Sequence, residues 1–152
     1  MRKRKVLVVE DQKLNRAVLK EILESEYDVL YAVNGKEALD IMNREGRHLS
    51  LVLLDIVMPV MDGYEVLKAM ERRKLLEQIP VLVASQRFGD DSELQALLLG
   101  AGDYVSKPYN PAVLKRRIKN QIRMHEALMQ VTVLEKDPVT GLYNNCLLYT
   151  SP

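Results

Sequence analysis

The stretch Leu49-Ser-Leu-Val-Leu-Leu-Asp55 is a nearly continuous apolar run that ends in a carboxylate. The turn signals Met58-Pro59 and Asp62-Gly63 follow it directly. A short run of this kind, rich in valine and leucine, is typical of a strand that is covered on both faces, as the strands of parallel sheets are. Asp55 is therefore expected at the carboxyl end of a buried strand.

Similar runs alternate with helix-period stretches on either side of residues 49–55. The other expected strands are Lys5–Glu10, Val29–Val33, Val81–Ser85 and Asp103–Ser106. The helices are expected after Asp11, from Asn34-Gly35 to Gly46, from Gly63 through Leu76, over about Asp90 to Leu99, and from Pro111 onward. Five strands, each followed by a helix, predict an α/β doubly wound fold with a parallel sheet.

Composition narrows the class of protein. The chain has 152 residues, 47% of them hydrophobic, which indicates one domain with a packed core and room for a tail. Its formal net charge of +1 gives no global attraction to nucleic acid or to a membrane. The single cysteine, Cys146, excludes an internal disulfide framework. The apolar run Val6–Val9 is too short for a signal peptide or a membrane span, so we expect a soluble, cytoplasmic protein.

Five chemical groups are expected at one edge of the sheet, because ligands of such folds bind outside the carboxyl ends of the strands. They are Glu10, Asp11, Asp55, Ser85 and Lys107. Three carboxylates packed together repel one another, and Mg²⁺ with oxygen ligands would neutralise them. A carboxylate can also attack phosphorus and form an aspartyl-phosphate, with a lysine to balance the charge.

These residues resemble a known family. Asp55-Ile-Val-Met-Pro-Val-Met-Asp-Gly63 is similar to the phospho-acceptor loop of response-regulator receiver domains, and Ala32–Leu39 resembles the start of their second helix. Glu10-Asp11, Ser85 and Lys107-Pro108 follow the order and spacing of the family. The resemblance covers about residues 4–123. It implies a flavodoxin-like sheet with strand order 2-1-3-4-5, helices on both faces and an extended C-terminal helix.

The resemblance also implies a phosphorylation site. Asp55 would be phosphorylated by a sensor histidine kinase or a phosphotransfer protein. The ligands of Mg²⁺ would be Glu10, Asp11, Asp55 and the backbone carbonyl of Val57. The chain would not be an enzyme in its own right, since a receiver only assists its own phosphorylation.

Further roles follow from the same resemblance. Ser85 and Lys107 would contact the phosphoryl group, and Ser85 with Tyr104 would form the switch pair. Lys107-Pro108 would be a cis peptide. Gln86 departs from the family pattern, in which a small residue is usual, and it could crowd access to the phosphate.

Simpler interpretations of each residue remain open. Asp55 could be a strand-end carboxylate satisfied by backbone amides, and Lys107 could be part of a structural ion pair. Ser85 could cap its strand and Tyr104 could be a core aromatic.

The chain as a whole could be a stand-alone receiver or a pseudo-receiver that acts as an interaction module. A phosphatase of the haloacid dehalogenase type is disfavoured because Val57 stands where that class needs a second aspartate. A dinucleotide-binding domain is disfavoured because no Gly-x-Gly-x-x-Gly follows the first strand.

The last helix extends past the expected domain boundary. Met124, Ala127, Val131 and Leu134 recur at heptad-like spacing, which predicts a helical linker over residues 124–136. A helix lengthened by its own propensity is the alternative. Basic residues crowd its first half: Lys115, Arg116, Arg117, Lys119 and Arg123. Without a helix-turn-helix and with few aromatics, we expect a solvated or dimer-facing surface and no direct contact with nucleic acid. A homodimer would use the fourth and fifth helices and the linker.

The end of the chain resembles the start of another domain. Asp137-Pro-Val-Thr-Gly-Leu-Tyr-Asn-Asn145 is similar to the opening of diguanylate cyclase (GGDEF) domains, from which Val139 and Asn145 depart. A plain helix stop is the alternative. Cys146–Pro152 is what TGTCTCTTATACACATCTCC would encode, a sequence resembling a transposon end used to prepare sequencing libraries. We therefore expect a receiver domain over 1–123, a linker, the start of a truncated cyclase domain over 137–145, and a non-native tail over 146–152.

Overall fold

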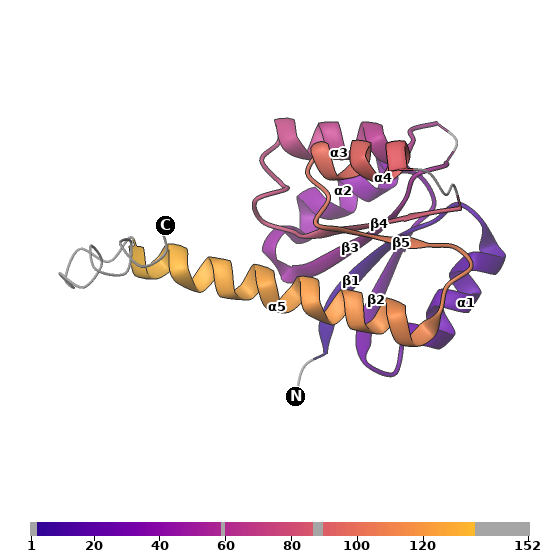
Figure 1. Ribbon diagram of the computed structural model, residues 1–152, viewed down its shortest axis with the longest axis horizontal. Coiled ribbons are helices and arrows are strands. Elements are labelled where there is room, and N and C mark those ends of the chain that lie inside the picture. Colours follow the sequence, from indigo (N-terminus) through magenta and orange to yellow (C-terminus); the bar gives the residue numbers. More distant parts are fainter. Residues whose placement is uncertain (1–2, 59, 87–89, 136–152) are drawn as a thin grey trace. The chain divides into compact units, whose positions relative to one another are not determined.

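The computed structural model describes residues 3–58, 60–86 and 90–135. Within them the strands form one five-stranded parallel sheet in the order β2-β1-β3-β4-β5 (Figure 1). The strands are β1 (Arg4–Val9), β2 (Tyr27–Ala32), β3 (Leu49–Asp55), β4 (Val81–Ser85) and β5 (Asp103–Ser106). The predicted flavodoxin-like fold and its strand order are confirmed.

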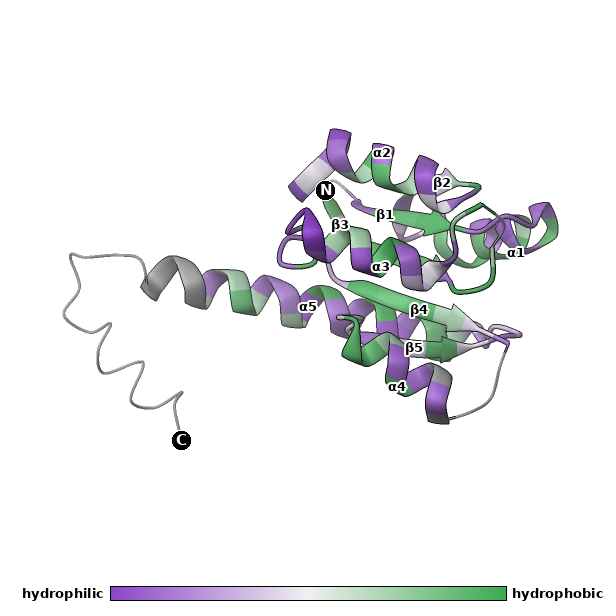
Figure 2. Cartoon of the chain, turned by 90° about the horizontal axis from the view of Figure 1, so that it is seen from above, coloured by the Kyte–Doolittle hydropathy of each residue, from purple (hydrophilic) through white to green (hydrophobic). Residues whose placement is uncertain are grey.

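Helices cover both faces of the sheet. They are α1 (Lys13–Leu23), α2 (Gly35–Glu45), the short 3₁₀ helix η1 (Gly46–His48), α3 (Gly63–Arg72), α4 (Asp90–Leu98) and α5 (Pro111–Glu135). Residues of α1 and α5 pack on one face, and residues of α2, α3 and α4 pack on the other. Because every crossover carries a helix over the sheet, the strands are shielded on both sides, and Figure 2 shows β4 in the colour of apolar residues.

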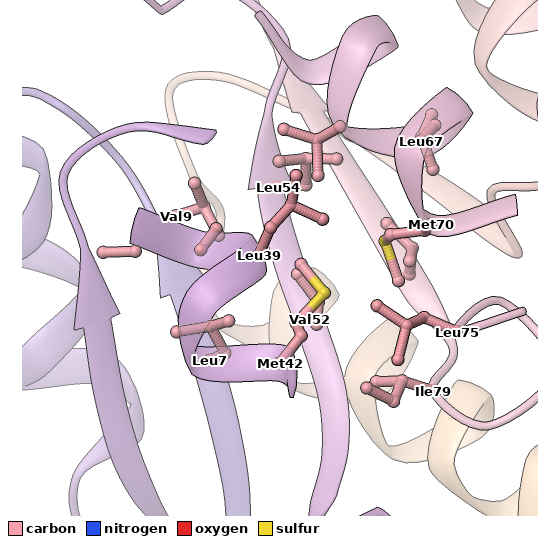
Figure 3. Packing of buried hydrophobic residues seen from close by; sticks show 14 of the residues in the cluster. Leu7, Val9, Leu39, Met42, Val52, Leu54, Leu67, Met70, Leu75 and Ile79 are labelled. Atoms are coloured by element: carbon pink, nitrogen blue, oxygen red, sulfur yellow. The ribbon is translucent and has the colours of Figure 1, made fainter. Parts of the chain in front are cut away.

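Alternation along the strands divides the core in two. In β1, Val6 and Val8 face the α1 and α5 layer, whereas Leu7 and Val9 face the other layer. Figure 3 shows the layer that contains Leu7 and Val9, in which Leu39 and Met42 of α2 lie against strand residues. All of these side chains are nearly inaccessible to solvent, so substitutions in either layer act on the whole sheet.

The boundaries of β1, β2 and α3 differ from the sequence prediction. β1 ends at Val9, which leaves Glu10 in the loop beyond the strand, and β2 begins two residues earlier than expected. The predicted third helix was too long, since α3 ends at Arg72. Lys74 adopts a left-handed backbone (φ 59°), and the Leu75 N–H then donates to the Met70 carbonyl at 2.8 Å, which closes the helix.

The limits of α2 agree with its sequence signals. The Asn34 side chain accepts a hydrogen bond from the Glu37 N–H at 2.8 Å and so satisfies one of the free amides at the start of the helix. Gly46 follows the helix with φ 53°, a conformation that glycine adopts without steric cost. Both positions were predicted as boundaries from residue type.

The chain divides into two compact units, Met1–Ile122 and Arg123–Pro152, and α5 contributes to both. The first unit contains the sheet and all the residues discussed below as a site. The side chains of Val131 and Leu134, the stretch Asp137–Asn145 and the tail to Pro152 lie outside the described residues, so the interpretations that concern them stay predictions. Among the described residues, no helix is long and apolar enough to cross a membrane.

Candidate functional site

The carboxyl ends of the strands bring four predicted site residues together. Glu10, Asp55, Ser85 and Lys107 are buried polar residues with exposed fractions of 1%, 4%, 1% and 8%. Asp11, next to Glu10, is half-buried. Burying a charge costs free energy unless the charge is paired, so the charged groups at this edge must pair with one another.

Lys107 lies between two of the acids. Its ammonium nitrogen is 2.9 Å from Glu10 Oε1 and 3.1 Å from Asp55 Oδ1. One cation therefore faces two carboxylates, and Asp11 adds a third nearby. The cluster retains excess negative charge, in contrast to a structural ion pair, in which one acid would balance one base.

The three acids are close enough to share one cation. One carboxylate oxygen from each of Glu10, Asp11 and Asp55 lies within 4.8 Å of the other two. Ligands on opposite sides of Mg²⁺ are about 4.2 Å apart, given metal–oxygen distances of about 2.1 Å. Oxygen donors of this spacing and surplus charge fit a hard divalent cation such as Mg²⁺.

Burial and the neighbouring charges shift the pKa values of the three acids. Burial and the neighbouring Glu10 carboxylate raise the pKa of Asp55 from 3.8 to about 6. Burial also raises the pKa of Glu10, but the hydrogen bond and charge of Lys107 outweigh it and hold that pKa below its usual value. Burial and Glu10 raise the pKa of Asp11. The acid with the least compensated charge is thus Asp55.

The loop after β3 is held against the strand that precedes it. The Gly63 N–H donates to the Ile56 carbonyl at 2.9 Å, and a side chain at Gly63 would lie 2.7 Å from the backbone oxygen of Asp55. Asp62 begins α3 with a capping box, in which its carboxylate and that of Glu65 each accept the other's N–H. Only glycine fits this approach, so the loop presents Asp55 in a fixed position.

The turn after β1 is held by a residue that the sequence analysis did not single out. Arg16 Nη1 donates to the carbonyl oxygens of Glu10 and Asp11, both at 2.9 Å. The Gln12 N–H donates to Glu10 Oε2 at 3.2 Å. An arginine one turn into a helix that follows an acidic pair is the only signal of this role in the sequence.

A cleft of about 260 Å³ leads from the surface to Asp55. Its lining consists of Gln12, Asn15, Asp55, Val57, Gln86 and Lys107. Carboxamides therefore surround the mouth of the cleft, and the acid and the lysine form its floor. A larger hollow of about 500 Å³ lies at the opposite edge of the sheet, around Lys3 and Tyr27, and it contains none of the predicted site residues.

Ser85 and Tyr104 lie on the two strands next to the site. Ser85 ends β4, and its carbonyl accepts the Lys107 N–H at 2.9 Å. Tyr104 on β5 is half-buried and packs against the cluster of α2, α3 and α4. The Lys107–Pro108 peptide is cis. These placements put a hydroxyl and an aromatic ring on neighbouring strands of the sheet.

The sequence matches a known protein family. The family model for the response regulator receiver domain matches residues 6–119. The chain belongs to this family. The receiver domain so identified accounts for three quarters of the sequence and contains every residue of the cluster, which confirms the resemblance drawn from the motifs.

Curated relatives of this receiver domain are regulators. The chain is 33% identical over 139 residues to the alkaline phosphatase synthesis transcriptional regulatory protein PhoP of Bacillus subtilis, covering 91% of this chain and 56% of that protein. It is 36% identical over 120 residues to the transcriptional regulatory protein CpxR of Escherichia coli, covering 78% and 49%. The chain thus spans about half the length of the curated relatives it matches.

Solved structures show the same fold. The chemotaxis protein CheY4 of Vibrio cholerae has a TM-score of 0.72 and 27% identity, covering 78% of this chain and 98% of that one. A probable two-component system response regulator/GGDEF domain protein has a TM-score of 0.74 and 26% identity, covering 80% of this chain and 50% of that one. A chain of the complex between the Saccharomyces cerevisiae phosphotransfer protein Ypd1 and the receiver domain of Ssk1 has a TM-score of 0.74 and 28% identity, covering 81% and 91%.

Proposed function

We propose that this receiver domain accepts a phosphoryl group on Asp55 from a phosphohistidine of a sensor histidine kinase or phosphotransfer protein. The observation that supports this most directly is the position of Asp55, which lies at the floor of a cleft within 3.1 Å of the Lys107 ammonium. The likeness to a chain of the Ypd1–Ssk1 complex is consistent with a phosphohistidine partner.

The transfer needs little covalent chemistry from the protein. A carboxylate oxygen of Asp55 forms a bond to phosphorus, the bond between phosphorus and the histidine nitrogen breaks, and the imidazole leaves with the electron pair. Lys107 contributes a fixed positive charge beside the Asp55 carboxylate, and the cleft orients the donor. The negative charge of the cluster opposes this step unless a cation is added.

Mg²⁺ is the cation that fits, and we assign Glu10, Asp11, Asp55 and the backbone carbonyl of Val57 as the residues that would hold it. The donor set consists of hard oxygens, and the carboxylate oxygens lie within 4.8 Å of one another. When bound, the ion supplies charge neutralisation to the phosphoryl oxygens. Exposure of Val57 at the mouth of the cleft leaves room for water ligands.

The response to phosphorylation would pass through Ser85 and Tyr104. A phosphoryl group adds roughly −1.5 to −2 charge and three acceptor oxygens. The Ser85 hydroxyl and the Lys107 ammonium gain charge-assisted hydrogen bonds to it, and the β4 end moves toward Asp55. Tyr104 then follows inward, because it lies on the strand paired with β4. The phosphoryl group shifts a population that the unmodified protein already samples.

Intact-mass analysis tests the acceptor. The protein is incubated with Mg²⁺ and acetyl phosphate, beside Asp55→Ala and the control Asp40→Ala, which removes an exposed acid of α2. One added phosphoryl group on the parent and the control, and none on Asp55→Ala, is the expected result. No addition to a folded parent would overturn the proposal in favour of a pseudo-receiver that acts as an interaction module.

A second copy of the chain is the partner we propose for the face formed by α4, β5 and α5. A cleft of about 230 Å³ that Glu93, Tyr104 and Val113 help to line shows that these elements share a face. Leu98 on α4 is 76% exposed, and Arg116 on α5 is exposed as well. An acidic, leucine-bearing helix beside a basic helix is self-complementary under two-fold symmetry.

Light scattering after phosphorylation tests the dimer. The parent and Leu14→Glu, an exposed leucine of α1 replaced as a control, should double in mass with acetyl phosphate. Leu98→Glu should accept phosphate and stay monomeric. Dimerisation of Leu98→Glu to the same extent would contradict this surface.

The output module is the last part of the proposal. We propose that the receiver over residues 1–123 acts through the helix of residues 124–136 on a diguanylate cyclase domain that would begin near residue 137. The likeness to a response regulator/GGDEF protein and the continuation of α5 to Glu135 support this. The names of PhoP and CpxR favour a transcriptional output instead. Sequencing the native gene past the codon for Asn145 distinguishes the two, and it shows whether residues 146–152 belong to the protein.

A further inference from the structure

Arg16 makes two contacts that serve no purpose in α1 itself. Its guanidinium nitrogen Nη1 donates to the Glu10 carbonyl and to the Asp11 carbonyl, each at 2.9 Å. The side chain is half-buried and folds back from the first turn of the helix over the preceding loop. The acceptors are backbone oxygens and not carboxylates, so this contact sets geometry and leaves the charge of the acidic cluster to Lys107.

The two carbonyls belong to the residues that supply two of the three clustered acids. β1 ends at Val9, so Glu10 and Asp11 lie in the loop after the strand, beyond the residues that pair β1 with β2 and β3. The Glu10 N–H is held by the Ala32 carbonyl at 3.0 Å, which fixes the start of the loop. Arg16 fixes the two peptide groups that follow.

The orientation of these peptide groups decides where the carboxylates point. A rotation of either peptide plane turns the attached Cα–Cβ bond and carries the carboxylate away from Asp55. Metal sites are sensitive to such changes, since outer residues that orient the ligands typically affect affinity by about 10–100-fold.

We propose that Arg16 is a positioning residue for the divalent-cation site: by binding both carbonyls, its guanidinium holds the Glu10–Asp11 backbone so that the two carboxylates face Asp55. The inference rests on the proposed function, because it assumes that the cluster binds Mg²⁺. It adds to that function a residue outside the cluster on which the affinity for the ion depends.

Titration calorimetry with MgCl₂ on the unphosphorylated protein tests the inference. The variants are Arg16→Met, Arg16→Lys and the control Lys20→Met, which removes an exposed cation one turn further along α1. The dissociation constant for Mg²⁺ should rise about tenfold in Arg16→Met. It should rise by less in Arg16→Lys, whose ammonium keeps a donor near the carbonyls, and stay unchanged in Lys20→Met. Urea unfolding in EDTA reports whether each variant is folded, and Arg16→Lys carries the test if Arg16→Met is not.

Phosphorylation separates positioning from a general structural defect. At saturating Mg²⁺, Arg16→Met should be labelled by acetyl phosphate at close to the parent rate, whereas at low Mg²⁺ it should lag. Equal Mg²⁺ affinity in the parent and a folded Arg16 variant would overturn the inference alone. A folded parent that binds no Mg²⁺ would overturn the metal assignment of the proposed function, and this inference with it.

Discussion

Lys107 lies 3.1 Å from Asp55, although the two residues are 52 positions apart in the chain, Asp55 at the end of β3 and Lys107 directly after β5. The same ammonium is 2.9 Å from Glu10. This three-residue contact links the loop after β1, the end of β3 and the loop after β5. Two buried acids therefore share one cation at the carboxyl edge of the sheet.

Removing the lysine should be more damaging than removing any one acid. Lys107→Met leaves the buried carboxylates of Glu10 and Asp55 without a cationic partner, and the free energy of unfolding should fall by about 3–5 kcal/mol at pH 7. Urea unfolding measures this. The control Lys68→Met changes an exposed lysine of α3 and should fall within about 0.5 kcal/mol of the parent. A loss as small in Lys107→Met would show that the ion pair is dispensable.

Asp55→Asn should stabilise the metal-free protein above pH 6. The folded state raises the pKa of Asp55 from 3.8 to about 6, so the folded protein binds a proton that the unfolded chain releases between these values. Proton binding by Asp55 therefore contributes fully to the free energy of unfolding below pH 4, and this contribution is lost as the pH rises through 6. At about 1.36 kcal/mol per pH unit, the advantage of the asparagine reaches at most about 3 kcal/mol. Urea unfolding in EDTA from pH 4 to 8 checks this, and an advantage that does not grow with pH would contradict it.

Mg²⁺ should stabilise the folded parent. At ten times its dissociation constant, the ion adds about 1.4 kcal/mol, which corresponds to a rise of several degrees in Tm. Asp11→Asn removes one carboxylate ligand of the cluster and should abolish this rise without lowering Tm in EDTA, because burial and Glu10 already disfavour its charge. Differential scanning calorimetry with and without MgCl₂ gives both values. An equal rise in the variant would remove Asp11 from the ligand set.

Gln86→Ala should open the route to Asp55. Gln86 lines the cleft mouth, and alanine there removes four side-chain heavy atoms. Labelling by acetyl phosphate should accelerate by about threefold, which corresponds to a barrier about 0.7 kcal/mol lower. Gln95→Ala, an exposed residue of α4, is the control. A rate unchanged in Gln86→Ala would mean that this side chain does not restrict access.

Gly63→Ala should distort the acceptor strand. The new methyl group would lie 2.7 Å from the Asp55 carbonyl oxygen and 2.8 Å from Ile56 Cα, and backbone atoms cannot move aside cheaply. We expect a loss of about 1–3 kcal/mol in stability together with slower phosphorylation. Gly46→Ala, where nothing lies within 4 Å but φ is +53°, should lose about 1 kcal/mol and keep its phosphorylation rate. Equal rates in both variants would separate the close approach from function.

The sequence predicted β3, β4 and β5 to the residue, because short valine- and leucine-rich runs between turn signals leave little choice of register. It was less accurate where a helix stops for backbone reasons. Leu75 follows the apolar period of α3 and is buried, but it lies in the turn after the helix, which the left-handed Lys74 closes. Apolar spacing reports burial, and it cannot tell a last helical turn from a buried turn beyond it.

The sequence by itself determined which residues meet at the carboxyl edge, since parallel strands all end there and the acids, the serine and the lysine each follow one. Only the tertiary structure decided which of these groups pair with one another and which contacts keep them in position. Lys107 lies between Glu10 and Asp55, and the pKa of Asp55 is raised, because of distances across the sheet. The hydrogen bonds of Arg16 to two carbonyls depend on distances across a loop. Electrostatic and hydrogen-bond energies change steeply over one or two ångströms, and a pattern of residue types carries no such lengths.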